Sequence, residues 1–244
     1  MSEVPAELVE RVRDSRHLVI LTGAGVSAES GIATFRDPLT GLWENYRPEE
    51  LASPGGFTAD PQLVWDWYAW RRQQALEGEP NAAHHAIEQL ERLLPDVTLV
   101  TQNVDGLHQR AGSQTPLELH GNVHKLKCFS CEADGGDWPA DPTEMVHCQC
   151  GGLLRPGEVW FGESLPEAVI NGAFVAAQDC DVFLNVGTSS LVYPAAGLPL
   201  VAKQSGAYVV EINPQQTPLS DQLDLCLRVS AGKALPDLCA ALAA

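Results

Sequence analysis

The stretch Leu18-Val-Ile-Leu-Thr-Gly-Ala-Gly-Val-Ser-Ala-Glu-Ser-Gly31 decides the fold of this chain. Its first five residues are apolar or β-favouring and lead into Gly23-Ala-Gly25, after which a helix is predicted from about Val26. Strand, glycine turn and helix in this order are typical of a loop that holds the phosphates of a dinucleotide, because glycine lets the backbone approach a pyrophosphate closely. An ordinary β–α turn has the same appearance, so the rest of the chain has to decide between the two.

Composition and charge narrow the class of protein. The chain has 244 residues, 45% hydrophobic and 19% charged, which is typical of a globular protein with a full core. No apolar run reaches the ~18 to 20 residues of a membrane span, and the acidic N-terminus does not resemble a signal peptide. We therefore expect a cytoplasmic protein without membrane contact. The net charge of −17 argues against nucleic-acid binding and favours cationic, lysine-bearing partners, although solubility alone would also explain it.

Regular elements alternate along the chain in the manner of an α/β protein. Apolar spacing predicts helices over residues 5–15, 60–77, 82–94, 166–178, 194–205 and 233–242, and strands over 18–22, 97–101, 181–189, 208–213 and 225–229. Polar residues and glycines follow four of these strands: Gly23, Gln102, Asn103, Asp105, Gly187, Thr188, Ser189 and Asn213. The carboxyl ends of parallel strands meet at one sheet edge, where α/β proteins bind ligands. This convergence favours a nucleotide site over an ordinary turn.

The segment after the glycine turn departs from the fingerprint of a hydride-transferring dehydrogenase. Such an enzyme has a second strand that ends in an acidic residue about 20 residues further on, and none is predicted here. Residues 31–43 are instead rich in turn formers and contain Phe35 and Trp43. We interpret this segment as a loop that closes over the ligand.

Four of the seven cysteines lie in one window of 23 residues. Cys128 and Cys131 form a Cys-x-x-Cys pair, and Cys148 and Cys150 form a Cys-x-Cys pair followed by two glycines. This spacing predicts a structural zinc site, because four thiolates complete a tetrahedral shell and leave no open position for catalysis. The second pair is one residue shorter than usual, so His124 and His147 are alternative ligands.

Three further segments allow both a functional and a purely structural interpretation. Tyr68 and Arg71 share a face of the predicted helix, where a phenol and a guanidinium could bind a carboxylate, although such a pair is more often a solvated surface. His120 precedes a glycine at the end of an element and could be structural, but its closeness in sequence to the polar residues 102–105 favours a functional role. Residues 159–162 fit either an edge that pairs with an extended peptide or plain core aromatics.

Together these motifs resemble the sirtuins, which are NAD-dependent protein lysine deacylases. The resemblance rests on Gly23–Ile32 with Phe35-Arg36, Thr101–Asp105, His120-Gly121, the four cysteines, Trp160-Phe-Gly-Glu163, Gly187-Thr-Ser189 and Asn213, in family order over residues 17–240. It implies an α/β fold: a Rossmann-like parallel sheet, and a smaller part made of a zinc-binding module and a helical module. The large part would comprise about 1–35, 81–125 and 155–244, the helical insertion 36–80 and the zinc insertion 126–154.

The resemblance also implies roles for individual residues. His120 would be the general base, Asn103 would orient the ribose or a water, and Asp105 would bind the nicotinamide amide. NAD would be held by Gly23, Ala24, Gly25, Ala28, Phe35, Arg36, Gln102, Asn103, Asp105, Gly187, Thr188, Ser189, Asn213 and Ala231. NAD would be consumed as a co-substrate: the acyl oxygen attacks C1′ of its nicotinamide ribose, and free lysine, nicotinamide and an O-acyl-ADP-ribose are the products.

Substrate selectivity follows from the same resemblance. Tyr68 and Arg71 match the Tyr-x-x-Arg pair of the desuccinylase and demalonylase branch, the class III sirtuins, and would bind the distal carboxylate of succinyl- or malonyl-lysine. Val159, Phe161 and Gly162 would bind the substrate peptide. Three positions depart from the family pattern: Ala33 replaces a usual proline, Gly157-Glu158 replaces a His-Val or similar pair, and the second cysteine pair is short.

Two other functions stay open at this point. Transfer of ADP-ribose to a protein would use the same residues. A non-catalytic NAD- or zinc-dependent interaction module is disfavoured by the joint presence of His120, Asn103 and Asp105. We expect one structural zinc ion, acyl-lysine proteins as partners, and a monomer.

Overall fold

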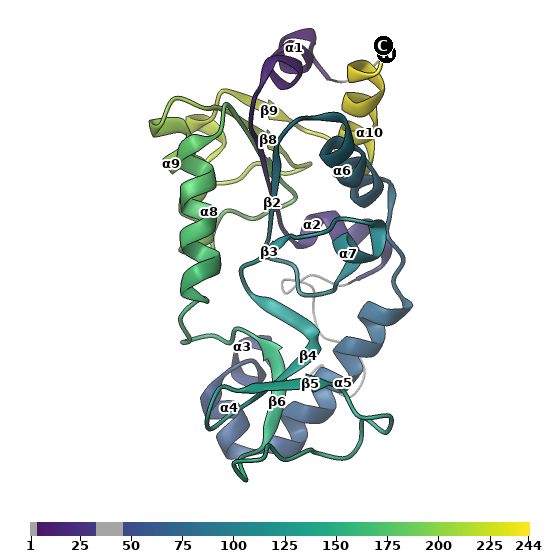
Figure 1. Cartoon of the computed structure of the whole chain (residues 1–244), viewed down its shortest axis with the longest axis vertical. Helices are drawn as coiled ribbons and strands as arrows, with labels where there is room; N and C mark the ends of the chain where they lie inside the picture. The colour runs from purple at the N-terminus through teal and green to yellow at the C-terminus, as the bar shows by residue number, and fades with distance from the viewer. Residues whose placement is uncertain (1–3, 33–45) are drawn as a thin grey trace.

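The computed structural model describes residues 4–32 and 46–244, so the predicted cofactor residues Phe35 and Arg36, and Ala33, lie outside the described residues. A six-stranded parallel sheet in the order β3-β2-β1-β7-β8-β9 forms the larger part of the molecule (Figure 1). Its strands are β1 (Leu18–Thr22), β2 (Val97–Thr101), β3 (Leu117–Glu118), β7 (Val182–Val186), β8 (Tyr208–Ile212) and β9 (Leu225–Leu227). The strand order reverses between β1 and β7, and the carboxyl ends at such a switch point are where open α/β sheets bind ligands.

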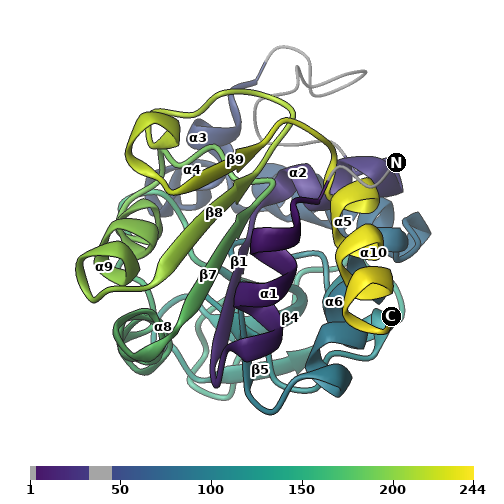
Figure 2. The ribbon, with the colours of Figure 1, turned by 90° about the horizontal axis from the view of Figure 1, so that it is seen from above.

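Helices cover both faces of this sheet, as its continuous apolar strands require. On one face lie α1 (Ala6–Asp14), α6 (Ala82–Leu93) and α10 (Ala231–Leu242); on the other lie α8 (Glu167–Asp179) and α9 (Leu198–Gln204) (Figure 2). Side chains of β1 point alternately to the two faces of the sheet. Leu18 and Ile20 pack against α1, α6 and α10, whereas Val19 and Leu21 pack against α8 and α9. Both faces of β1 are thereby buried.

A second, smaller part lies beyond the carboxyl edge of the sheet, at the bottom of Figure 1. It contains α3 (Pro48–Leu51), α4 (Pro54–Ala59), α5 (Pro61–Glu77) and an antiparallel sheet in the order β5-β4-β6. The strands of this sheet are β4 (Gly121–Cys128), β5 (Asp134–Asp137) and β6 (Leu154–Glu158). The suggested domain boundaries near 125 and 155 therefore fall inside β4 and β6. A separate core that includes Trp65, Trp67, Tyr68, Trp138 and Trp160 joins α5 to this sheet.

The sequence predicted most of these elements. The start of α5 is confirmed, with Asp60 accepting a hydrogen bond from the Leu63 amide (3.0 Å) and Pro61 in the first turn. The helix predicted over 194–205 is divided into a 3-10 turn (Ala195–Gly197) and α9. The two-residue β3 and the short helix α7 (Leu107–Ala111) were not predicted, because elements of this length carry no periodic signal. The helices α3 and α4 and all three strands of the small sheet were not predicted either. In the described residues, no helix is long and apolar enough to cross a membrane.

Candidate active site

The glycine turn after β1 packs directly against the loop after β7. Gly25 donates its amide to the carbonyl oxygen of Gly187 (2.8 Å), and Gly23 donates to Val186 (3.0 Å). A Cβ atom on Gly25 would lie 2.6 Å from the Gly187 oxygen, and one on Gly23 would lie 2.7 Å from the Thr188 Cα atom. These two amides are therefore engaged within the protein, and the glycines are required because the two loops touch. Ala24 begins the short helix α2 (Ala24–Ser27) beside this contact.

A buried polar network links the glycine turn to the residues after β2. The Asn103 Nδ2 atom donates to the Gly23 carbonyl oxygen and to the Ser27 hydroxyl, both at 3.1 Å. Ser27 in turn donates to a carboxylate oxygen of Asp105 (2.6 Å), whose other oxygen accepts from the Leu107 amide (2.9 Å). All three polar side chains are buried. Ser27 was missed as a site residue, although its place in the glycine stretch was a usable signal.

The ends of β2, β7 and β8 are tied together through Thr188. Gln102 donates from Nε2 to the Thr188 hydroxyl (2.8 Å), and Asn213 donates from Nδ2 to the Thr188 carbonyl oxygen (2.9 Å). Gly187 has φ +60, a left-handed conformation that favours glycine, and Ser189 lies half-buried beside it. The predicted residues after these three strands therefore lie together, at the switch point of the sheet.

Ala231 and Ala28 lie in segments that contact each other beside the glycine turn. The amide of Gly232, in the first turn of α10, donates to the Glu29 carboxylate (3.0 Å), and the Ser230 hydroxyl donates to the same carboxylate (3.3 Å). Ala28 is exposed and Ala231 is buried. The structure thus brings the last two predicted cofactor residues to the same end of the sheet.

His120 stands between the two parts of the molecule, directly before β4. Its Nδ1 atom lies 3.0 Å from the Gln102 carbonyl oxygen. A carbonyl oxygen can only accept a hydrogen bond, so Nδ1 carries the proton and Nε2 of the neutral ring is the basic nitrogen. Burial lowers the pKa of His120, while the Gln102 carbonyl and the charge of Glu158 act in the opposite direction. The imidazole is therefore neutral at physiological pH and able to accept a proton.

The backbone around His120 is clamped against β6. The Val159 amide donates to the His120 carbonyl oxygen (2.8 Å), and Gly121 is the register partner of Glu158. A Cβ atom on Gly121 would lie 2.1 Å from the Gly157 carbonyl oxygen, and Gly121 has φ +74. Glycine is thus the residue that lets β6 approach the histidine this closely.

Tyr68 and Arg71 do lie on one face of α5, and a carboxylate of the protein itself fills the space between them. The Glu158 side chain accepts from the Tyr68 hydroxyl (3.2 Å) and from Arg71 Nη1 through both of its oxygens (3.2 and 3.0 Å). Only 3% of the Glu158 side chain and 19% of the Arg71 side chain are exposed. The pair therefore binds a carboxylate of the protein itself and is not a solvated surface; we refer to Tyr68 and Arg71 below as the receptor. Sequence reasoning registered Glu158 only as a departure from the family pattern.

Aromatic rings surround this ion pair. The Arg71 guanidinium lies 5.0 Å from the Trp67 ring centroid, and the Tyr68 and Trp160 rings stack at 6.0 Å. Burial and the charge of Glu158 raise the pKa of Tyr68 well above its usual value, so the phenol keeps its proton and donates it. Burial alone would lower the pKa of Arg71, but Glu158 outweighs it and the pKa is raised. The receptor holds one positive and one negative charge.

The predicted peptide-binding edge is only partly open. Trp160 is core, with 2% of its surface exposed, whereas 46% of Phe161 is exposed. Val159 is half-buried, and Gly162 has φ +89. The Phe161 amide donates to the Ala52 carbonyl oxygen (2.9 Å), which fixes this segment to the helical insertion. Trp160 is thus a core aromatic, and pairing of the exposed residues with a substrate peptide stays a prediction.

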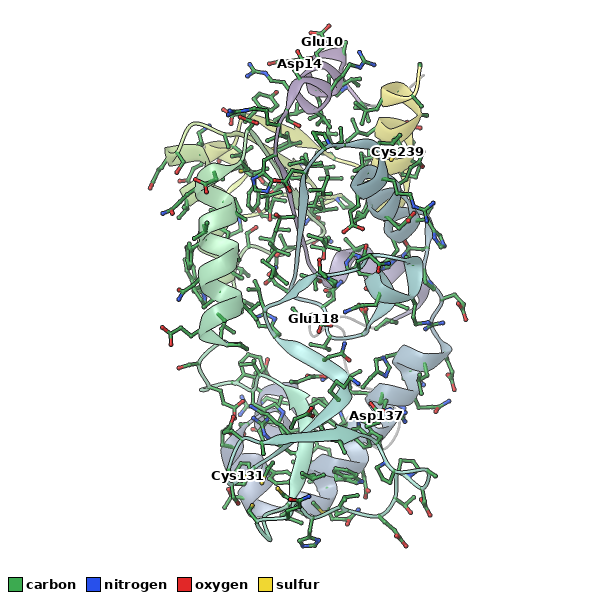
Figure 3. The ribbon with its side chains drawn as sticks, viewed as in Figure 1. Glu10, Asp14, Glu118, Cys131, Asp137 and Cys239 are labelled. Carbon is green, nitrogen blue, oxygen red and sulfur yellow. The ribbon has the colours of Figure 1, made fainter. Side chains whose placement is uncertain are left out.

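The four cysteines converge as a metal site requires. The Sγ atoms of Cys128, Cys131, Cys148 and Cys150 all lie within 4.8 Å of one another. His124 is occupied elsewhere, since its Nε2 atom lies 2.9 Å from the Asp105 carbonyl oxygen, and His147 is outside the cluster. Four thiolates fit one structural zinc ion in tetrahedral coordination. Figure 3 shows Cys131 in the smaller part, well away from Glu118 at the end of β3, as expected for a metal without a catalytic role.

Comparison with known proteins agrees with this geometry. Residues 23–194 match the Sir2 family. An NAD-dependent protein deacylase of Methylococcus capsulatus is 51% identical, over 98% of this chain and 98% of its own. A solved Sir2 homologue in complex with NAD superposes with a TM-score of 0.93 at 46% identity, covering 99% of this chain and 95% of the other. A mutant Sir2 homologue in complex with 2′-O-acetyl ADP ribose gives 0.91 at 47% identity, covering 98% and 97%.

Proposed function

Because this chain belongs to the Sir2 family, we propose that it is an NAD-dependent protein lysine deacylase that accepts succinyl and malonyl groups as well as acetyl groups. The deacylase activity follows from relatives that are about half identical over nearly the whole chain. One observation carries the choice of acyl group: Tyr68 and Arg71 bind a carboxylate within the protein, with all three contacts at 3.0–3.2 Å. The chemistry of this pair suits the distal carboxylate of succinyl- or malonyl-lysine.

The residues that would hold NAD fit it. The loops after β1 and β7 approach so closely that a Cβ atom on either glycine would clash, which leaves backbone rather than side chains facing the sheet edge. The phosphates would lie beside the turn of Gly23, Ala24 and Gly25, and Ser189, Asn213, Ala28 and Ala231 would hold the adenosine end. NAD, when bound, supplies an electrophilic ribose carbon whose bond to nicotinamide is broken.

The chain's own residues would then position groups and move one proton. His120 would accept a proton at Nε2 from a ribose hydroxyl, because its Nδ1 proton is held by the Gln102 carbonyl. Asn103, fixed by two hydrogen bonds, would orient the ribose or a water, and Asp105 would face the nicotinamide amide. Phe161 and Gly162, in the exposed turn after β6, would bind the substrate peptide with Val159.

Transfer of ADP-ribose to a protein, the alternative that the sequence left open, is not favoured, since the relatives are named protein deacylases. We further propose that residues 36–80 and 126–154 form the small part of one catalytic domain, and that the chain acts as a monomer. A four-thiolate zinc site is typical of a reducing compartment, which supports the cytoplasm, and the net charge of −17 disfavours nucleic acid as a partner.

A single assay tests the proposed function. The purified chain is incubated with NAD and peptides of one sequence that carry acetyl- or succinyl-lysine, and nicotinamide release and peptide mass are followed. We expect nicotinamide release together with loss of the acyl mass from both peptides. A peptide or protein that gains the mass of ADP-ribose would favour the transferase instead, and no nicotinamide release from either peptide would contradict the proposal.

A further inference from the structure

Glu158 fills the space between Tyr68 and Arg71, to which the proposed function assigns the carboxylate of the substrate. Both of its oxygens contact Arg71 Nη1, one of them also accepts from Tyr68, and the side chain is almost completely buried. The receptor is thus already filled and electrically neutral. Sequence reasoning alone would count Tyr68 and Arg71 as one free positive site.

We infer that Glu158 is a built-in competitor for acidic acyl groups and determines how the enzyme selects between charged and uncharged acyl-lysine. This inference rests on the proposed function, because it names the specificity residue of the same acyl site. An uncharged acyl group leaves the Arg71–Glu158 ion pair intact. A succinyl or malonyl group binds to Arg71 only after the Glu158 carboxylate has moved aside.

The charge balance of the site gives the physical reason. Two carboxylates beside one guanidinium, in a site lined by Trp67, Tyr68 and Trp160, would leave one negative charge buried without compensation. Burying an unpaired charge is costly, and like charges brought together add to the cost. In addition, the Tyr68 phenol cannot compensate the second charge, since it is neutral.

The backbone holds Glu158 in this position. Glu158 pairs with Gly121 across the small sheet, and its carbonyl oxygen accepts from Arg155 Nη1 (3.3 Å). Arg155 is itself held by both oxygens of Glu163 (2.6 and 2.8 Å). The strand β6 is paired with β4, and Arg155 binds the Glu158 carbonyl oxygen, so any displacement of the carboxylate has to come from rotation of the Glu158 side chain.

The experiment compares three peptides of one sequence that carry acetyl-, succinyl- or succinamyl-lysine. Succinamyl is the uncharged amide of the succinyl group, so the two differ in charge at nearly equal size. Glu158→Gln removes the charge and keeps the volume, whereas Glu158→Ala removes both. Glu118→Gln is the matched control, because Glu118 is a half-buried carboxylate of the large sheet that contacts Gln109 and Asn122 rather than the receptor. Deacetylation, zinc content and thermal unfolding report whether each variant is folded.

The measured quantity is the ratio of kcat/KM for the succinyl peptide to that for the succinamyl peptide. We expect a ratio below one in the unaltered chain and in Glu118→Gln, and a rise of about tenfold or more in both Glu158 variants, since a like charge next to the ligand disfavours its binding. Deacetylation by Glu118→Gln should change by less than about threefold, and because the succinyl-to-succinamyl ratio is taken within one variant, a change in the basal activity of a Glu158 variant cancels from it. An unchanged ratio in both Glu158 variants, or a rise in the alanine variant alone, would overturn the inference.

Other outcomes separate this inference from the proposed function. If the Glu158 variants lose deacetylation through misfolding, the unaltered chain still tests the inference, because a succinyl-to-succinamyl ratio well above one overturns it. If the unaltered chain and the Glu158 variants remove succinyl groups equally well, the proposed function stands and only the inference is overturned. If the acetyl peptide is deacylated but no variant turns over the succinyl or the succinamyl peptide, two statements are overturned. These are the role of Tyr68 and Arg71 in binding acidic acyl groups and the role of Glu158 as their competitor.

Discussion

The Nδ1 atom of His120 lies 3.0 Å from the carbonyl oxygen of Gln102, the first residue after β2. This contact joins the end of a strand of the large sheet to the start of β4 in the small sheet. It orients the imidazole and leaves Nε2 as the basic nitrogen. The geometry of the proposed general base is therefore set at the junction of the two parts of the molecule.

Replacing His120 by alanine should abolish turnover and leave the fold intact. A positioned general base contributes roughly 10²- to 10⁴-fold, so kcat should fall by about that factor. Nicotinamide release with NAD and acetyl-peptide measures the loss, and the thermal unfolding midpoint checks the fold. His85→Ala is the matched control, because His85 is exposed on α6 and should leave both quantities unchanged. Full activity in the His120 variant would refute its role.

The pH dependence of deacetylation should report the state of His120. The base works in its neutral form, and burial lowers its pKa, so kcat/KM should stay level at neutral pH and fall only on acidification below the usual histidine value. The charge of Glu158 raises the pKa of His120, so Glu158→Gln should move the acidic limb to still lower pH. Profiles of kcat/KM against pH for both proteins test this, and a limb displaced to higher pH would contradict it.

The double variant Tyr68→Phe with Arg71→Met should lower desuccinylation far more than deacetylation, by about tenfold or more, because only the acidic acyl group uses the charge of Arg71. Leaving Glu158 buried without its partner costs about 3–5 kcal/mol, so the thermal unfolding midpoint should fall as well. Adding Glu158→Gln should restore much of that stability. Equal losses on succinyl and acetyl peptides would refute the receptor.

Removal of the metal should unfold the small sheet. Cys131→Ser removes one of four thiolates, so the protein should lose its zinc and show a lower unfolding midpoint, with activity lost because β4 carries the residues after His120. Zinc content by atomic absorption and unfolding by circular dichroism are the measurements. Cys226→Ser, at a half-buried cysteine outside the cluster, should keep its zinc. A zinc content equal in the two variants would contradict the assignment.

Gly25→Ala should damage the glycine turn that we propose to hold NAD. Its Cβ atom would lie 2.6 Å from the Gly187 oxygen, so the two loops would have to separate, at about 1–3 kcal/mol. We expect a lower unfolding midpoint and a raised KM for NAD. Gly55→Ala is the control, because a Cβ atom there meets nothing within 4 Å. An unchanged KM for NAD in Gly25→Ala would argue against binding at this loop.

Much of the framework could be predicted from the sequence because it depends on local patterns. Five of the six strands of the large sheet lie where apolar runs predicted them, and the capping pair Asp60-Pro61 marked the start of α5. The cysteine spacing predicted the metal cluster. In contrast, β3 and α7 are too short for periodicity, and Ser27 bonds to Asp105 across 78 positions of sequence. Contacts of that kind depend on packing between elements.

By itself, the sequence determined the order of strands and helices, the polar edge at their carboxyl ends and the four thiolates, since each follows from residue type and spacing along one segment. Only the tertiary structure decided what fills the receptor of Tyr68 and Arg71. Glu158 reaches this pair from a strand 90 residues after Tyr68, brought there by the close approach of Gly121 and Gly157. Whether the Glu158 carboxylate is solvated or bound to the buried Arg71 guanidinium depends on how α5 and β6 pack. That packing cannot be predicted from a local sequence pattern.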